Sequence, residues 1–287
     1  MDIHVSIAAE TIFSIGPLNV TNSFLTMIAV MIIILLVGAR IARRATVSPS
    51  GYGQFIFESF VDFMLGIVEN TAGKRVGRRI WPLIGGLFVF IILSNYSGLL
   101  PGVGTIGVYQ EEETEEAAQI AYVAPSNAQT PTLAQEEEEH HEVLVPLMRS
   151  PSADLNMTLA MAILAIVIVQ VAGIMAHGFG GRIKHMADPW WIFPLEVIAE
   201  ISRIVSLSFR LFGNVFAGEV LVAVMIGIAA ATWFLVATLA VPTIFLFLEV
   251  LFGFVQALVF ALLTLIYLAL AVAGADEHGN PEEAHGH

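Results

Sequence analysis

Long apolar segments, separated by shorter polar connections, make up most of this chain. Five of them are long enough to cross about 30 Å of hydrocarbon as helices, so each is predicted to be a membrane span. They cover residues 20–44, 80–100, 153–178, 190–231 and 232–274. The last two are unusually long, because a helix over residues 194–229 measures about 52 Å at about 1.5 Å per residue. We therefore expect these two either to tilt steeply across the bilayer or to break.

Residues 50–70 mix apolar and acidic positions instead of forming a continuous apolar run. Phe60 and Phe63 stand close to Glu58 and Asp62, a pattern typical of an amphipathic helix. We expect this helix to lie along the membrane interface, where it could either dock a partner helix or anchor the chain.

Residues 103–150 form the longest polar interruption. They contain acidic runs at 111–116 and 136–142, joined by a stretch that is rich in Pro, Ser, Thr, Ala and Gln and has no helical period. This composition predicts a disordered acidic insert outside the membrane. Two functional alternatives are an antenna that concentrates protons and a metal site at His140 and His141.

Composition supports the same class of protein. Of the 287 residues, 57% are hydrophobic and 13% are charged, and the mean hydropathy is +0.81, far from an average soluble domain. The predicted fold class is an all-α integral membrane protein with five transmembrane helices and one interfacial helix. The first apolar run has no basic segment before it and no cleavage pattern after it, so we expect a retained span. The absence of cysteine excludes disulfides and thiolate metal sites.

The basic residues predict how the chain is oriented. Nine of the twelve Lys and Arg residues lie at the end of a span or just beyond it, within residues 40–44, 74–79 and 182–184. Since cytoplasmic connections collect Lys and Arg, these three segments are expected in the cytoplasm and the N-terminus outside. With five spans, the polar tail at residues 275–287 is then cytoplasmic.

Arg210 is the most informative single residue, because it lies inside the fourth apolar segment. An arginine is charged at any biological pH, and holding one at the bilayer centre costs at least about 2.5 to 3.5 kcal/mol. On a helical wheel, Glu219 falls about 180° from Arg210, so the two side chains cannot share an environment on an unbroken helix. Glu196, Arg203, Ser206, Asn214 and Ala217 all fall within about 40° of Arg210 and form one stripe of polar and small residues.

The last apolar segment carries a second polar stripe. Glu249, Gln256 and Tyr267 line up within about 40° of one another, and Gly253 leaves room beside them for a close neighbour. Gln256 is as well suited to an interhelical hydrogen bond as to a channel.

Two paths for protons fit these stripes. A carboxylate in a partly wetted, apolar site can relay protons, whereas an arginine stays charged. We therefore interpret Glu219 and Glu249 as proton-carrying groups and Arg210 as a barrier between two aqueous paths. The bland alternative is a buried ion pair between Arg210 and a nearby glutamate that holds helices together. For Glu200, a place near the cytoplasmic interface is the simpler interpretation.

Four stretches of the sequence resemble one known family. These are SLSFRLFGNVFAGE around Arg210, ILSNYSGLLPG at 92–102, PSADLNMTLAMAI at 151–163 and VQALVFALLTLIYL at 255–268. Together they are similar to subunit a of the membrane sector of rotary F-type ATP synthases. The resemblance covers nearly the whole chain outside residues 103–150.

The resemblance implies a proton-conducting stator that catalyses no covalent chemistry and needs no cofactor or metal. Its two long helices would form a steeply tilted hairpin against a rotor ring of c-type subunits, with Arg210 facing the ring's carboxylates. The implied ion-translocating residues are Arg210, Asn214, Glu219, Glu249, Gln256 and Glu196, and Glu249 stands where several members of the family carry histidine.

The resemblance also implies partners and a location. The expected partners are the whole ATP synthase complex, membrane lipid, and b-type subunits of a peripheral stalk at residues 50–70, but no nucleic acid. The expected location is the bacterial inner membrane. The rival class is a self-contained proton-coupled transporter that binds an anionic substrate at Arg210; it predicts inverted repeats, and no convincing internal repeat is found.

Overall fold

The chain folds into long helices with two small hairpins of strands. The computed structural model describes residues 9–16, 18–44, 46, 51–100, 103, 106–111, 142–186, 190–231 and 235–273. The long helices are α1 (Asn22–Arg44), α2 (Tyr52–Ser97), α4 (Leu155–Met186), α5 (Phe193–Ala231) and α6 (Leu235–Val272). Within the described residues, five helices are long and apolar enough to cross a membrane. The predicted all-α membrane fold is confirmed, and the two longest segments are continuous helices.

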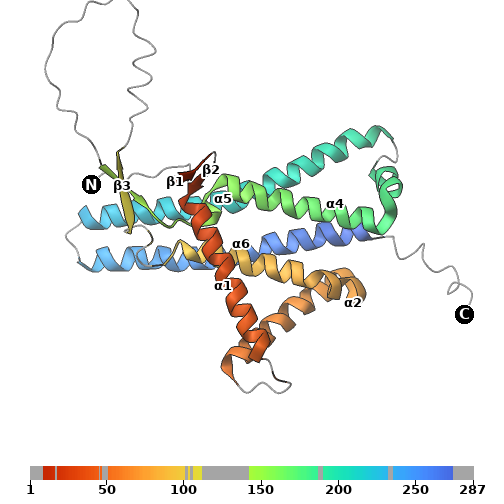
Figure 1. The fold of residues 1–287 in the computed structure, drawn as a ribbon, viewed down its shortest axis with the longest axis horizontal. Helices are drawn as coiled ribbons and strands as arrows, with labels where there is room; N and C mark the ends of the chain where they lie inside the picture. Colours follow the sequence, from red (N-terminus) through yellow and green to blue (C-terminus); the bar gives the residue numbers. More distant parts are fainter. Residues whose placement is uncertain are drawn as a thin grey trace, which may run out of the picture.

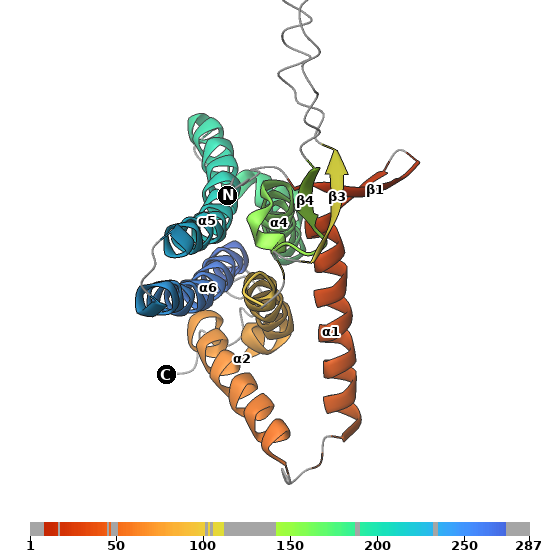
Figure 2. The ribbon, with the colours of Figure 1, turned by 90° about the vertical axis from the view of Figure 1, so that its left-hand side faces the viewer.

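Four helices form a bundle, and the fifth crosses it. Figure 1 shows α4, α5, α6 and the second half of α2 running roughly along one axis, while α1 crosses that axis steeply. Figure 2 looks along the bundle and shows α5 beside α6, with α1 standing upright at the far side of α2 and α4. Because α1 contacts mainly α2 and the segment before α4, most of its apolar surface stays uncovered, as expected for a helix that faces lipid.

The hydrophobic core lies where the four bundle helices meet. The largest side chains buried there include Ile84 and Ile91 from α2, Leu211 from α5, and Phe260 and Leu265 from α6. Small residues on the facing helices, such as those at 162, 165, 257 and 261, let the backbones approach closely. This packing fixes the positions of α5 and α6 relative to α2, which matters for the polar side chains described below.

Two glycines break helices α2 and α4. Gly73 (φ 75°, ψ 159°) and Gly178 (φ 73°, ψ 162°) both adopt a positive φ that side chains other than glycine rarely tolerate. At Gly73 the chain turns sharply, so that Arg78 Nε lies 2.9 Å from Glu69 Oε1 across the bend. The break separates a first arm, residues 52–72, which contains most of the amphipathic helix predicted at 50–70, from the second predicted span.

The first arm of α2 is amphipathic in the structure as well. Met64 and Val68 are buried against the bundle, whereas Phe55, Ile56 and Phe63 are exposed. The arm therefore presents an uncovered apolar face on the side away from the core.

The chain also forms two antiparallel hairpins, one before α1 and one between α2 and α4. The first pairs β1 (Thr11–Ile15) with β2 (Leu18–Thr21), and the second pairs β3 (Gly107–Glu111) with β4 (Glu142–Pro146). Backbone pairing orders both ends of the predicted 103–150 insert, so the expectation of disorder over that whole range is wrong at its ends. Most of the insert, residues 112–141, lies outside the described residues, and so does the tail at 275–287.

Side chains cap the N-termini of α1 and α4 and tie them together. Thr21 Oγ1 accepts a hydrogen bond from the backbone N–H of Phe24 at 3.3 Å, and Asp154 Oδ1 accepts one from the backbone N–H of Asn156 at 2.9 Å. The second oxygen of Asp154 accepts a hydrogen bond from Ser23 Oγ at 3.2 Å. The two helices therefore start at the same end of the molecule.

Candidate functional site

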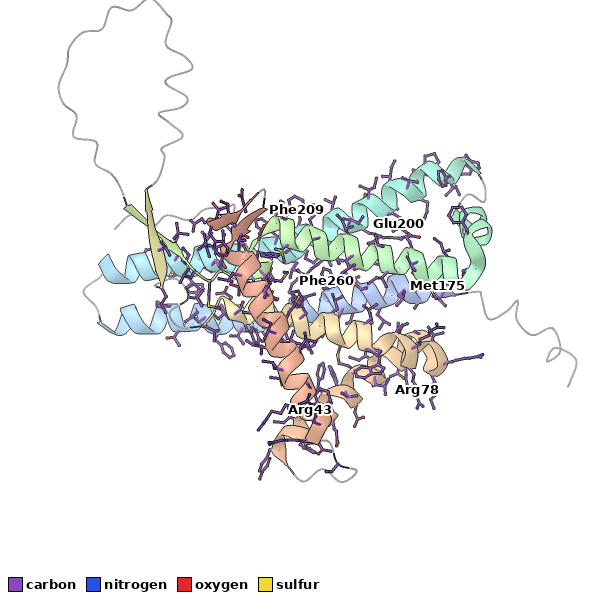
Figure 3. The ribbon with its side chains drawn as sticks, in the orientation of Figure 1. Arg43, Arg78, Met175, Glu200, Phe209 and Phe260 are labelled. Carbon is purple, nitrogen blue, oxygen red and sulfur yellow. The ribbon has the colours of Figure 1, made fainter. Side chains whose placement is uncertain are left out.

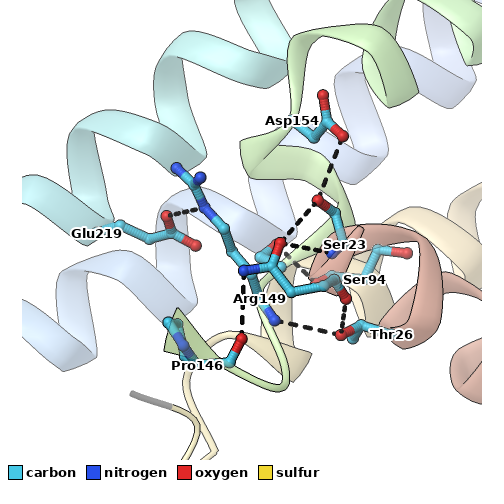
Figure 4. A network of polar contacts seen from close by, with 9 residues as sticks. Ser23, Thr26, Ser94, Pro146, Arg149, Asp154 and Glu219 are labelled. Atoms are coloured by element: carbon cyan, nitrogen blue, oxygen red, sulfur yellow. Dashed lines mark hydrogen bonds and ion pairs between the residues drawn. The ribbon is translucent and has the colours of Figure 1, made fainter. Parts of the chain in front are cut away.

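A polar cluster of Arg149, Glu219 and Glu249 lies at the end of the bundle where α1 and α4 begin; we call it the Arg149 cluster. Arg149 Nε donates to Glu219 Oε2 at 3.3 Å, and the side chains of these two residues are 10% and 23% exposed. Figure 4 shows the arginine reaching from the segment before α4 to the glutamate on α5. Because both side chains are largely shielded from solvent, removal of one partner would leave a buried charge without compensation from water.

Hydrogen bonds fix the backbone that carries Arg149. The N–H of Arg149 donates to Thr26 Oγ1 at 3.2 Å, and Ser150 Oγ donates to the carbonyl oxygen of Ser94 at 2.9 Å. The segment is thus held between α1 and the last turn of α2 (Figure 4). At that turn Gly98 leaves no room for a side chain, since a Cβ there would lie 2.9 Å from Ser150 Cβ.

Glu249 completes the cluster from α6. Its carboxylate lies against Gly218, where a Cβ would be 2.7 Å from Glu249 Oε1. Since Gly218 directly precedes Glu219, the two carboxylates come from neighbouring points of the α5–α6 contact. The glycine is therefore needed for close approach and not for its backbone conformation.

The last turn of α2 holds α6 beside Glu249. Asn95 Nδ2 donates to the carbonyl oxygen of Gly253 at 3.0 Å, and the Tyr96 hydroxyl donates to that of Val250 at 3.0 Å. One turn further, Gln256 is 7% exposed and its Nε2 has no hydrogen-bond partner among the described residues. A buried amide donor of this kind is suited to a partner from outside the chain.

A second group, the Arg203 cluster, lies toward the other end of α5. Arg203 Nη1 donates to Glu200 Oε1 at 2.7 Å, Nη2 lies 4.0 Å from Glu196 Oε1, and the guanidinium stacks 5.0 Å from the ring centroid of Tyr267 on α6. The side chain of Glu200 is only 12% exposed and forms an ion pair with Arg203. Its expected place near the cytoplasmic interface stays a prediction. Figure 3 labels Glu200 on this half of α5, with Phe209 closer to the middle.

Arg210 lies between the two clusters and belongs to neither. It is exposed, and Nη2 donates to Ser206 Oγ at 3.3 Å one turn back along the same helix. Within the described part of the chain it forms no ion pair. The described residues therefore give no support to the buried ion pair that was the alternative for Arg210. Asn214, one turn further along α5, is partly buried.

The structure brings together only some of the residues singled out from the sequence. Glu219 and Glu249 meet in one cluster, Glu196 belongs to the other, and Arg210 stands apart on an exposed face, as the helical wheel predicts for Arg210 and Glu219. Arg149 is the residue that sequence reasoning missed, because it falls inside the predicted insert. The sequence does contain a signal for it. Arg149 directly precedes SPSAD, at the end of the 153–178 span that is opposite to the basic residues Arg182 and Lys184.

Metal binding receives no support from the described residues, where no group of three His, Cys, Asp or Glu side chains comes close enough to hold an ion. The alternative metal site at His140 and His141 lies outside those residues.

Comparison with known proteins gives a consistent result over nearly the whole chain. The family model of the ATP synthase A chain matches residues 23–269. ATP synthase subunit a of Moorella thermoacetica is 33% identical over 92% of this chain and 96% of its own length. The subunits a of Desulforamulus reducens and Helicobacter pylori are 29% and 27% identical, over 92% and 90% of this chain and 83% and 92% of their own lengths.

Proposed function

The chain belongs to the ATP synthase A chain family, and on this premise we propose that Arg210 separates two half-channels through which protons reach and leave the rotor. As a member of this family it is a multi-pass membrane subunit of the proton-translocating sector, works with the c-ring, and is not itself catalytic. The proposal concerns which of its side chains carry out these tasks.

The exposed, unpaired position of Arg210 between two carboxylate clusters is the observation that carries the proposal. At about 1.5 Å per residue, the arginine lies about 10 Å along α5 from Arg203 and about 13 Å from Glu219. A guanidinium with no ion pair among the described residues is available to a carboxylate presented by another protein. We infer that this carboxylate belongs to the rotor ring and releases its proton when it meets Arg210.

The two clusters supply groups for the two half-channels. On one side, the path by which protons reach the ring is lined by carboxylates and amides, those of Glu219, Glu249, Asn214 and Gln256. On the other side, Glu196 lines the path by which protons leave. Because Arg210 keeps its positive charge, a proton cannot cross directly from one cluster to the other. The transmembrane gradient, about 2.3 kcal/mol per charge per 100 mV, then biases the direction of rotor movement.

Orientation and further partners follow from the charge pattern and the exposed surface. Arg43 and Arg78 both lie away from the two strand hairpins (Figure 3). We therefore place these arginines on the cytoplasmic side of a bacterial inner membrane and the N-terminus on the outside. The exposed apolar face of residues 52–72 is proposed to contact a b-type subunit of the peripheral stalk. The uncovered face of α1 is proposed to contact lipid.

The proposal is tested by Arg210→Ala in the assembled ATP synthase. We expect ATP-driven acidification of inverted membrane vesicles to fall to background, because rotor carboxylates then keep their protons. The control is Arg43→Ala, which removes an exposed arginine at the end of α1 and should leave acidification unchanged. Acidification at the parental rate in the Arg210→Ala enzyme would show that Arg210 does not separate the two paths.

A further inference from the structure

Arg149 brings a fixed cation to one of the two carboxylate clusters, and the residues implied by the family resemblance do not include it. Three features define its position: the backbone is hydrogen-bonded to Thr26, the neighbouring Ser150 is hydrogen-bonded to Ser94, and the side chain is 10% exposed. Elements from three parts of the chain therefore converge to hold one guanidinium against Glu219.

The two carboxylates of the cluster have different surroundings. Glu219 accepts a hydrogen bond from Arg149, so its negative charge is compensated within the pair. Glu249 lies against the backbone at Gly218, and it forms no ion pair with any residue in the described part of the chain. Because an arginine side chain is always charged, Glu219 keeps a positive partner whether or not Glu249 carries a proton.

We propose that Arg149 is a positioning residue that keeps Glu219 as a fixed carboxylate, so that Glu249 is the group that takes up and passes on protons in this half-channel. The inference rests on the proposed function. In each cycle Glu249 accepts a proton from water, becomes neutral, and gives the proton to a rotor carboxylate; Glu219 keeps its negative charge throughout.

The assignment predicts how the pair responds when one member is removed. In Glu219→Gln, Arg149 loses the carboxylate with which it is paired. Glu249 is then the remaining carboxylate of the cluster, so we expect the positive charge of Arg149 to favour its charged form. A cation within about 6 Å favours the charged form of a carboxylate tenfold or more, so Glu249 is rarely protonated. In Arg149→Gln, the two carboxylates instead compete for the same proton.

The experiment measures passive proton flux through the membrane sector, in vesicles stripped of the catalytic sector, with co-purification of the rotor ring as the check on assembly. We expect Glu219→Gln and Arg149→Gln each to lower the flux about tenfold or more. The double variant Arg149→Gln and Glu219→Gln, which replaces the ion pair by two amides, should recover flux well above either single variant. Arg149→Lys, which keeps the charge, should lose less than Arg149→Gln.

A third substitution separates positioning from a merely structural role. Adding Glu249→Gln to the double variant should abolish the recovered flux, since Glu249 is the carrier in both backgrounds. A double variant that conducts no better than Glu219→Gln would show that Glu219 itself carries protons and would overturn the proposal. An unchanged flux in Arg149→Gln would do the same.

The design stays decisive if single variants assemble poorly. In that case the double variant, compared with its Glu249→Gln derivative, still tests whether conduction persists without the ion pair and depends on Glu249. Failure of the proposed function is recognised separately, because it appears as pumping in Arg210→Ala; failure of this inference leaves the Arg210→Ala result intact.

Discussion

Replacing Gly218 by alanine perturbs the proton path with a single methyl group. The new Cβ would lie 2.7 Å from Oε1, 2.9 Å from Cδ and 3.2 Å from Cγ of Glu249. Ordinary contacts begin at about 3.4 Å, so the carboxylate has to move by about 0.7 Å. Overpacking of this kind costs about 1–3 kcal/mol when a core cannot give way; here the obstacle is the end of a side chain with rotatable bonds, so the cost falls at or below the lower limit.

The effect on conduction should be larger than the effect on stability. A misplacement of about 1 Å at a reacting group lowers a rate by up to about a hundredfold, so we expect passive proton flux to fall about tenfold to a hundredfold while the rotor ring still co-purifies. The matched control is Gly86→Ala, because Gly86 is also inside a long helix and a Cβ there meets nothing within 4 Å. Its flux should equal that of the parent.

A compensating change makes the Gly218 test more specific. Glu249→Asp shortens the side chain by one methylene and withdraws the carboxylate from the new methyl group. In the Gly218→Ala background it should therefore recover part of the flux. Parental flux in Gly218→Ala itself would refute the reasoning, because the observed position of the Glu249 carboxylate would then be irrelevant to conduction.

Two other substitutions test features of the fold. Gly73→Ala should destabilise the assembled complex by about 1–3 kcal/mol, since alanine is strained at the positive φ of the α2 bend. Thermal unfolding of the detergent-solubilised complex measures this loss, with Gly86→Ala as the control. Equal melting temperatures for the two variants would contradict the prediction. Replacing residues 112–141 by Asn-Gly, which can join Glu111 to Glu142 in a two-residue hairpin, should leave ATP-driven pumping nearly intact, and a large loss of pumping would favour the proton-antenna alternative.

Sequence reasoning found the long helices because their signal is local. The run that became α5 is apolar over its whole length and carries one polar stripe, and both features depend only on neighbours in the chain. The sharp bend at Gly73 was less accessible, since an isolated glycine in a helical pattern is usually tolerated and only the positive φ reveals its purpose. Its position nevertheless coincides with the change from amphipathic to continuous apolar pattern.

The ion pair of Arg149 could not be derived from local pattern. Arg149 lies in the segment before α4, and its partner Glu219 is 70 residues away on α5. The acidic residues of the preceding stretch draw attention away from the one arginine at its end. The helical wheel did exclude Arg210 as the partner of Glu219, but a wheel describes only one helix. Finding the actual partner required the packing of α2, α5 and the segment before α4.

The contacts around Asp154 and Arg149 also have an order in time. A chain grows from its N-terminus at about 5–20 residues per second, so Arg149, made 70 residues before Glu219, waits roughly 4–14 s for its counter-charge during synthesis. The bond from Ser23 to Asp154 spans 131 residues and joins the first inserted helix to a later one. Both contacts can therefore form before α6 (Leu235–Val272) has been made, and only the later arrival of Glu249 on α6 completes the Arg149 cluster.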